Sequence, residues 1–155
     1  MQTILTGTDA KYSVHVMCST DRAEILRQLG TELYKAGCVK ESYIEAVCKR
    51  EIEFPTGLPM SGVCIAIPHA DVSHVISEAM AVGVLEQPVP FQVMGSKDEF
   101  VGAQLVFMLA IKDPQAQLDM LQRLVEGCQD EQVLYMLRDH ADVAAIDRIV
   151  KSFME

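Results

Sequence analysis

Residues 105–114 read LVFMLAIKDP, the longest clean apolar run of the chain followed at once by Asp113-Pro114. A continuous apolar run of this length predicts a strand buried on both faces, and it is far below the roughly 20 residues that cross a membrane. Aspartate caps helices and proline suits a first helical turn, so the sequence predicts a helix starting there. The apolar face of this helix carries Leu118, Leu121, Leu124 and Val125.

Two shorter apolar runs predict further buried strands. Residues 63–67 read VCIAI and end at Pro68, and residues 79–85 read AMAVGVL. The segment 53–62 contains two prolines and two glycines, which predicts a loop. Apolar residues at helical spacing predict four more helices, at residues 20–36, 40–50, 131–137 and 143–153.

Three aspartates stand where these helices begin and can cap them, namely Asp21, Asp130 and Asp142. Helices and strands are mixed along the chain, and strands that are apolar throughout need cover on both faces of their sheet. The sequence contains no repeat, no low-complexity run and no linker. We therefore predict an α/β fold, a single layered domain over residues 1–155 with a sheet sandwiched between helices.

The bulk composition argues against several classes of protein. The net charge is −9 and the pI is about 4.8, with no cluster of Lys and Arg, which argues against nucleic-acid binding and suits a basic protein partner. The N-terminus lacks the features of a signal peptide and no run is long enough for membrane insertion, so we expect a cytoplasmic protein. The five cysteines include no Cys-x-x-Cys pair and indicate neither a disulfide framework nor a zinc ribbon.

His69 has the most informative setting of the four histidines. It comes directly after the predicted strand 63–67 and Pro68, and the ends of strands are where a rigid sheet meets functional loops. Proline fixes its own φ and restricts the residue before it, which makes the approach to the ring rigid. A neutral imidazole is a nucleophile that can accept and release a phosphoryl group. By its pattern alone, His69 can equally be an ordinary loop histidine.

Three other residues are candidates for the same chemistry. Arg50 ends a predicted helix, where its guanidinium can either interact with the helix C-terminus or hold phosphate oxygens in its fork. Gln117 lies in the first turn of the helix after Asp113-Pro114, and its amide can face solvent, donate to phosphate or orient an imidazole. Thr56 lies in the predicted loop 53–62, where a hydroxyl can meet phosphate or help to orient the imidazole.

A metal site is the competing interpretation of the same region. His69, Asp71 and His74 are close in sequence, and zinc accepts imidazole and carboxylate ligands, so a metal-dependent hydrolase is an alternative. Their spacing matches no recognised ligand pattern, and no distant fourth ligand is evident. The chain also lacks a Walker-type loop, a nucleophile elbow and a dinucleotide fingerprint, which argues against nucleotide-driven kinase chemistry.

Four stretches occur in an order and at spacings typical of one family. They read KREIEFPTG at 49–57, IAIPHA at 65–70, VFMLA at 106–110 and QAQLDML at 115–121. With these stretches, the sequence resembles the fructose/mannitol-type (type 2) EIIA domains of the phosphoenolpyruvate-dependent sugar phosphotransferase system (PTS) over nearly the whole chain. The resemblance implies a mixed β-sheet between helices, His69 as the phosphorylated residue and Arg50 as an aid to the transfer.

The resemblance also implies the partners of a phosphate relay. Phosphate would come from the phosphocarrier HPr and pass to a cysteine of a cognate EIIB, which serves a membrane EIIC, and the relay needs no metal or cofactor. Gln117 stands where many of these domains carry a second histidine, and together with the EFPTG stretch it makes the sequence most similar to the galactitol-specific branch. A regulatory EIIA-like module that feeds no transporter would show the same pattern, so that alternative stays open.

Overall fold

The computed structural model describes residues 1–7 and 11–155. Within these residues the strands form one mixed sheet in the order β1-β2-β5-β6-β4-β3. The strands are β1 (Gln2–Thr6), β2 (Tyr12–Met17), β3 (Gly57–Leu58), β4 (Cys64–Ala66), β5 (Ala79–Gln92) and β6 (Phe100–Ala110). The pairs β2–β5 and β4–β6 are parallel, and the other neighbours are antiparallel.

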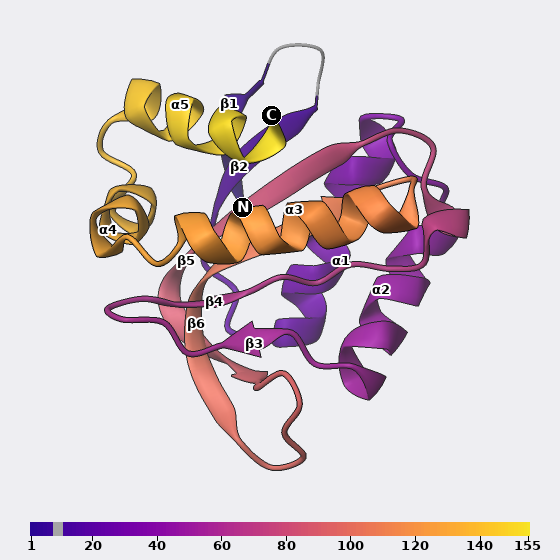
Figure 1. The fold of residues 1–155 in the computed structure, drawn as a ribbon, viewed down its shortest axis with the longest axis horizontal. Coiled ribbons are helices and arrows are strands. Elements are labelled where there is room, and N and C mark those ends of the chain that lie inside the picture. The colour runs from indigo at the N-terminus through magenta and orange to yellow at the C-terminus, as the bar shows by residue number, and fades with distance from the viewer. Residues whose placement is uncertain (8–10) are drawn as a thin grey trace.

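Helices cover both faces of this sheet, as Figure 1 shows. They are α1 (Arg22–Lys35), α2 (Ser42–Glu53), α3 (Pro114–Gly127), α4 (Glu131–Asp139) and α5 (Val143–Met154), with a short 3-10 turn η2 (Val72–His74) after β4. One hydrophobic core lies between the sheet and α1 and α2, and a second lies between the sheet and α3, α4 and α5. The predicted layered α/β domain is therefore confirmed.

The central strand β6 explains why the sheet needs cover on both sides. Successive residues of a strand point to opposite faces. Leu105 and Phe107 belong to the core under α3, α4 and α5, whereas Val106 and Met108 belong to the core under α1 and α2. All four side chains are fully buried, so the apolar run 105–111 is a strand buried on both faces.

Side-chain caps begin four of the helices at the residues that the sequence indicated. The carboxylates of Asp21, Asp113, Asp130 and Asp142 each accept a hydrogen bond from a backbone N–H in the first turn of α1, α3, α4 and α5 respectively. Pro114 is the first residue of α3, where its missing N–H costs nothing. These caps fix where α3 starts after β6, and thereby place the first turn of α3 close to the end of β4.

Some of the predicted boundaries were wrong. The N-terminal strands β1 and β2 were not predicted, β5 runs on to Gln92, and β6 starts as early as Phe100. The predicted loop 53–62 contains β3, which pairs with β4. A Cβ on Gly57 would lie 2.6 Å from the carbonyl oxygen of Gln92, so the glycine permits a close approach of two backbones rather than a flexible turn.

Leu118 was predicted on the apolar face of α3, but half of it is exposed. Leu124, which was predicted on that face, and Met120, which was not, are the buried residues of the helix. Among the described residues, no helix is both long and apolar enough to cross a membrane.

Candidate active site

His69 stands at the carboxyl end of β4 and is held there by β6. The N–H of Leu109 donates to the carbonyl of Pro68 at 3.0 Å, and His69 itself forms a parallel bridge with Leu109. Only 8% of His69 is exposed. The imidazole is therefore a rigidly placed, largely buried group and not a side chain on a free loop.

One ring nitrogen of His69 is occupied by the backbone. Nδ1 lies 2.9 Å from the carbonyl oxygen of Ile67. A carbonyl only accepts hydrogen bonds, so Nδ1 donates and carries the proton. In the neutral ring, Nε2 then holds the free lone pair.

Burial lowers the pKa of His69 below its ordinary value. The hydrogen bond to Ile67 opposes this shift, and the positive charge of Arg50 adds to it. Both burial and a neighbouring cation disfavour the imidazolium. The ring is therefore neutral at physiological pH, with Nε2 available as a nucleophile.

Arg50 lies in the last turn of α2, which continues to Glu53 rather than ending at residue 50 as predicted. Its guanidinium carbon is 5.2 Å from the centre of the Phe54 ring, in cation–π geometry. Among the residues that the structure describes, its Nε is buried without a hydrogen-bond partner. A buried N–H without an acceptor is costly, which favours a role in which Arg50 meets an incoming anion.

Gln117 reaches the same loop from the first turns of α3. Its Nε2 donates to the carbonyl of Ala70 at 3.3 Å, across 47 positions of sequence. Ala70 directly follows His69, so this contact ties α3 to the segment that carries the imidazole. The structure thus ties Gln117 to the residue after His69, and it places Arg50 close enough for its charge to act on the His69 ring.

Thr56 occupies a different place from the phosphate contact that the sequence suggested. It is 3% exposed, and its hydroxyl accepts from the N–H of Ile67 at 3.1 Å while it lies 2.9 Å from Oε2 of Glu51. A hydroxyl can donate one hydrogen bond, and here it donates that bond to the carboxylate of Glu51. Thr56 therefore supports the strand that leads to His69 and is not free to donate to a phosphate.

Glu51 is the residue of this region that the sequence analysis missed. It is 5% exposed, and burial raises its pKa to about 7, although the hydrogen bonds from Thr56 and the charges of Arg22 and Arg50 oppose the shift. Its spacing held a signal, because Glu51 follows the buried Tyr43 and Val47 at intervals of four residues. Such residues share one face of a helix.

The three residues of the alternative metal site each have a different hydrogen-bond partner, and these partners lie in different parts of the fold. Asp71 is exposed and caps η2 by accepting from the N–H of Ser73, and Nδ1 of His74 is 2.8 Å from the hydroxyl of Ser42. Throughout residues 1–7 and 11–155, no three His, Cys, Asp or Glu side chains are grouped as a metal ion would require. The geometry gives His69 no co-ligands.

A buried neutral imidazole whose Nδ1 is held by the backbone, near an arginine whose buried Nε has no acceptor within the described residues, suits the class of proteins that carry a phosphoryl group on histidine. Comparison with known proteins supports the same class. Residues 11–153 match the family model described as phosphoenolpyruvate-dependent sugar phosphotransferase system, EIIA 2. The chain belongs to this family, and it is therefore a phosphotransferase component with a role in phosphoryl relay.

Two curated relatives place the chain within the family. It is 34% identical over 117 residues to the galactitol-specific EIIA component of Escherichia coli (strain K12). The aligned residues cover 76% of this chain and 77% of that protein. It is 30% identical over 136 residues to the fructose-specific EIIABC component of Bacillus subtilis (strain 168), covering 85% of this chain and 20% of that protein. The predicted family and the predicted likeness to the galactitol branch are confirmed.

Solved structures support the fold. The crystal structure of IIA mannitol from Escherichia coli matches with a TM-score of 0.72 at 23% identity, covering 94% of this chain and 99% of that chain. The complex of enzyme IIAMTL and phosphorylated enzyme IIBMTL from the same organism matches with a TM-score of 0.73 at 24% identity, covering 95% and 97%. At these identities the likeness concerns the arrangement of helices and strands.

Proposed function

We propose that this chain accepts a phosphoryl group from phospho-HPr on Nε2 of His69 and passes it to a cysteine of a cognate EIIB. The EIIB would serve a membrane EIIC that takes up a sugar or sugar alcohol, and the similarity to a galactitol-specific EIIA favours galactitol. The relay would work in the cytoplasm, where HPr is found. The observation that carries the proposal is the hydrogen bond from Nδ1 of His69 to Ile67, which leaves Nε2 free in a ring of lowered pKa.

The transfer exchanges one phosphorus–nitrogen bond for another. The lone pair of Nε2 attacks phosphorus while the bond to the donor imidazole breaks, and the donor ring keeps that electron pair. The proton on Nδ1 of His69 stays in place, so the ring gains positive charge that the Ile67 carbonyl stabilises. This chemistry depends on position and charge stabilisation more than on covalent help.

Arg50 would stabilise the phosphoryl oxygens during this step. Its Nε has no protein acceptor within the described residues, and stacking on Phe54 orients the guanidinium plane. A planar guanidinium can bind two oxygens at once, which an ammonium cannot.

The surface next to these residues suits transient partners. Ile52 and Phe54, at the end of α2, are 74% and 59% exposed, and Leu118 beside Gln117 is 50% exposed. Exposed apolar side chains near a reactive group are typical of a docking site. The net charge of −9 adds attraction to basic partners without binding them permanently.

The experiment that tests the proposal is phosphate transfer with identification of the modified atom. The protein, labelled with ¹⁵N-histidine, is mixed with phosphoenolpyruvate, enzyme I and HPr. We expect one acid-labile phosphate by intact mass, and ¹⁵N NMR that places it on Nε2 of His69. A reaction without HPr is the control. Absence of phosphate on the folded protein would refute the relay, and phosphate on Nδ1 would refute the geometry on which it rests.

Gln117 would contribute by holding the segment after His69. We expect Gln117→Ala to lower the rate of phosphate acceptance about threefold to tenfold, the scale of one neutral hydrogen bond. Gln115→Ala is a matched control, because Gln115 is exposed on the same helix and its side-chain amide donates a hydrogen bond to Asp119. Rapid-quench measurement of the acceptance rate separates the two variants, and equal rates for both would exclude this role of Gln117.

A further inference from the structure

A buried carboxyl group lies behind the strand that leads to His69. Oε1 of Glu51 is 2.9 Å from the backbone nitrogen of Thr56, and Oε2 is 2.9 Å from the hydroxyl of the same residue. Both donors belong to one residue, so the carboxylate holds Thr56 at two points. Glu51 and Thr56 are both almost completely buried.

The hydrogen bonds continue from Thr56 to His69. The hydroxyl oxygen of Thr56 accepts from the N–H of Ile67 at 3.1 Å, and the carbonyl of Ile67 accepts from Nδ1 of His69 at 2.9 Å. The N–H and the C=O of Ile67 belong to different peptide planes. The connection is therefore one of position, since Thr56 anchors the residue whose carbonyl selects the protonated nitrogen of His69.

A carboxylate suits this anchoring better than most side chains. Above its pKa the carboxyl group of Glu51 is ionised, accepts hydrogen bonds and donates none, so the Thr56 hydroxyl then points its proton at Glu51. The lone pairs of that hydroxyl remain for the N–H of Ile67. A side chain at position 51 that could only donate would turn the hydroxyl around and leave the buried N–H of Ile67 without an acceptor, which is costly.

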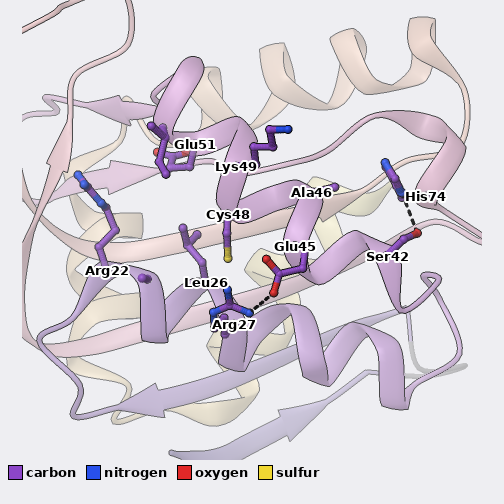
Figure 2. Close-up of a pocket in the computed structure, with 12 residues that line it drawn as sticks. Arg22, Leu26, Arg27, Ser42, Glu45, Ala46, Cys48, Lys49, Glu51 and His74 are labelled. Carbon is purple, nitrogen blue, oxygen red and sulfur yellow. Dashed lines mark hydrogen bonds and ion pairs between the residues drawn. The ribbon is translucent and has the colours of Figure 1, made fainter.

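The position of Glu51 is otherwise unfavourable for an acid. The same face of α2 buries Tyr43 and Val47, and removal from water raises the pKa of Glu51 to about 7. Glu51 also borders a cavity of about 670 Å³ between α1 and α2, where Figure 2 shows it with Arg22 and Lys49. His69 does not line this cavity, and the hydrogen bonds that lead from Glu51 toward the imidazole run through Thr56 and Ile67.

We propose that Glu51 is a positioning residue for the phosphoryl transfer, holding His69 through Thr56 and the backbone of Ile67 with Nδ1 protonated and Nε2 free. The proposal rests on the proposed function in that it takes His69 as the acceptor. The control of the His69 tautomer by Glu51 does not depend on phosphorylation, so it can be measured in the unphosphorylated protein without any partner.

The test compares two pairs of variants. Glu51→Ala removes the acceptor, whereas Glu51→Gln keeps an oxygen at the position of Oε1. That position lies within hydrogen-bond distance of both the N–H (2.9 Å) and the hydroxyl (3.0 Å) of Thr56. Thr56→Val removes the hydroxyl at nearly constant shape, whereas Thr56→Ser keeps it. Glu53→Ala, an exposed glutamate two residues further along α2, is the matched control. Each protein is checked for folding by circular dichroism and thermal melting, and if Glu51→Ala fails to fold, the Thr56 pair carries the test.

Two readouts separate positioning from general support of the fold. ¹⁵N chemical shifts of the His69 ring report the tautomer, and single-turnover kinetics report acceptance of phosphate from phospho-HPr. We expect Glu51→Ala and Thr56→Val to show mixed tautomers and to accept phosphate about 10- to 100-fold more slowly, the scale of a small misplacement of a reacting group. Glu51→Gln and Thr56→Ser should recover most of the rate and the single tautomer.

Two results would overturn the proposal. One is a folded Glu51→Ala or Thr56→Val protein with a single Nδ1–H tautomer and the rate of the unmodified protein. The other is a Glu51→Gln protein that is as slow as Glu51→Ala with a normal tautomer, because charge and not position would then matter. If the unmodified protein accepts no phosphate but the tautomer shifts in the variants, the relay fails while the positioning role of Glu51 stands.

Discussion

Replacing His69 with alanine is expected to abolish phosphate acceptance altogether. His15 cannot substitute for it. His15 is 1% exposed and both its ring nitrogens are hydrogen-bonded to the hydroxyls of Thr3 and Ser13. The reaction needs a nucleophilic nitrogen at the site, so its removal is not a loss of rate but a loss of the acceptor.

The fold of the His69→Ala protein should remain intact. The substitution removes the hydrogen bond from Nδ1 to the Ile67 carbonyl, at a cost of about 1 kcal/mol, and the packing of a buried ring, which adds to that cost. Pro68 keeps its backbone bond to Leu109, so the end of β4 stays in place. Intact mass spectrometry after incubation with phosphoenolpyruvate, enzyme I and HPr measures the phosphate, and thermal melting measures the stability.

His74→Gln is the matched control, because His74 lies five residues further on and bonds Ser42 instead. We expect this variant to accept one phosphate as the unmodified protein does. A phosphate that persists in His69→Ala, or that disappears in His74→Gln alone, would move the phosphorylated residue away from His69 and contradict the proposed function.

The continuous apolar runs of the sheet were visible in the sequence, and its segments of mixed composition were not. In β6, the residues from Leu105 onward are buried on both faces and give the apolar run that predicted a strand. The first part of β6, from Phe100 to Gln104, mixes exposed and half-buried residues, with only Ala103 buried, and was not recognised. Its pairing with the end of β5 determines its conformation, and that pairing is remote from any local pattern.

The strand β2 was missed for a related reason. It contains Ser13 and His15 in a short segment with a mixed pattern, and it becomes a strand because it pairs in parallel with β5, more than 60 residues away. His15 is tolerated in this buried position because two hydroxyls satisfy its ring. The pairing of β2 with β5 cannot be deduced from the residues next to β2 in the sequence.

The site shows the same division between local and tertiary information. The setting of His69 after a strand and Pro68, together with the family resemblance, predicted His69 as the centre of the site. The structure ties the residue after His69 to Gln117 and brings the charge of Arg50 within reach of the ring. The orientation of the Thr56 hydroxyl follows from its contact with the buried Glu51, which no local pattern in the loop indicates. Sequence analysis therefore named the candidate reactive groups more readily than the groups that would hold them in place.

The second large effect is expected at Arg50. Arg50→Met keeps an unbranched side chain that can pack on Phe54 but removes the charge and all donors. We expect it to slow phosphate acceptance about 10²- to 10³-fold, as for the loss of a donor that stabilises developing negative charge. The acceptance rate of Arg50→Lys should lie between those of the unmodified protein and Arg50→Met, because an ammonium supplies charge without the bidentate geometry. Single-turnover rates from phospho-HPr provide the measurement.

Arg50→Met should also change the pH dependence of the reaction. Acceptance needs the neutral ring, so its rate falls as the pH drops through the pKa of His69. Burial and, to a smaller extent, Arg50 lower this pKa, which keeps the unmodified protein active below the ordinary value of a histidine. Without the cation, the pKa of His69 should rise and the loss of rate should begin at a higher pH.

The two effects of Arg50 separate by their dependence on pH. A change in the pKa of His69 alone would disappear at pH 8, where the ring is neutral in both proteins, whereas lost stabilisation of the phosphoryl group would persist there. We expect most of the effect to persist at pH 8, because the unpartnered Nε indicates an arginine arranged for an anion. Equal rates for Arg50→Met and the unmodified protein at pH 8 would reduce Arg50 to a regulator of the His69 pKa and would exclude it as a phosphate-binding residue.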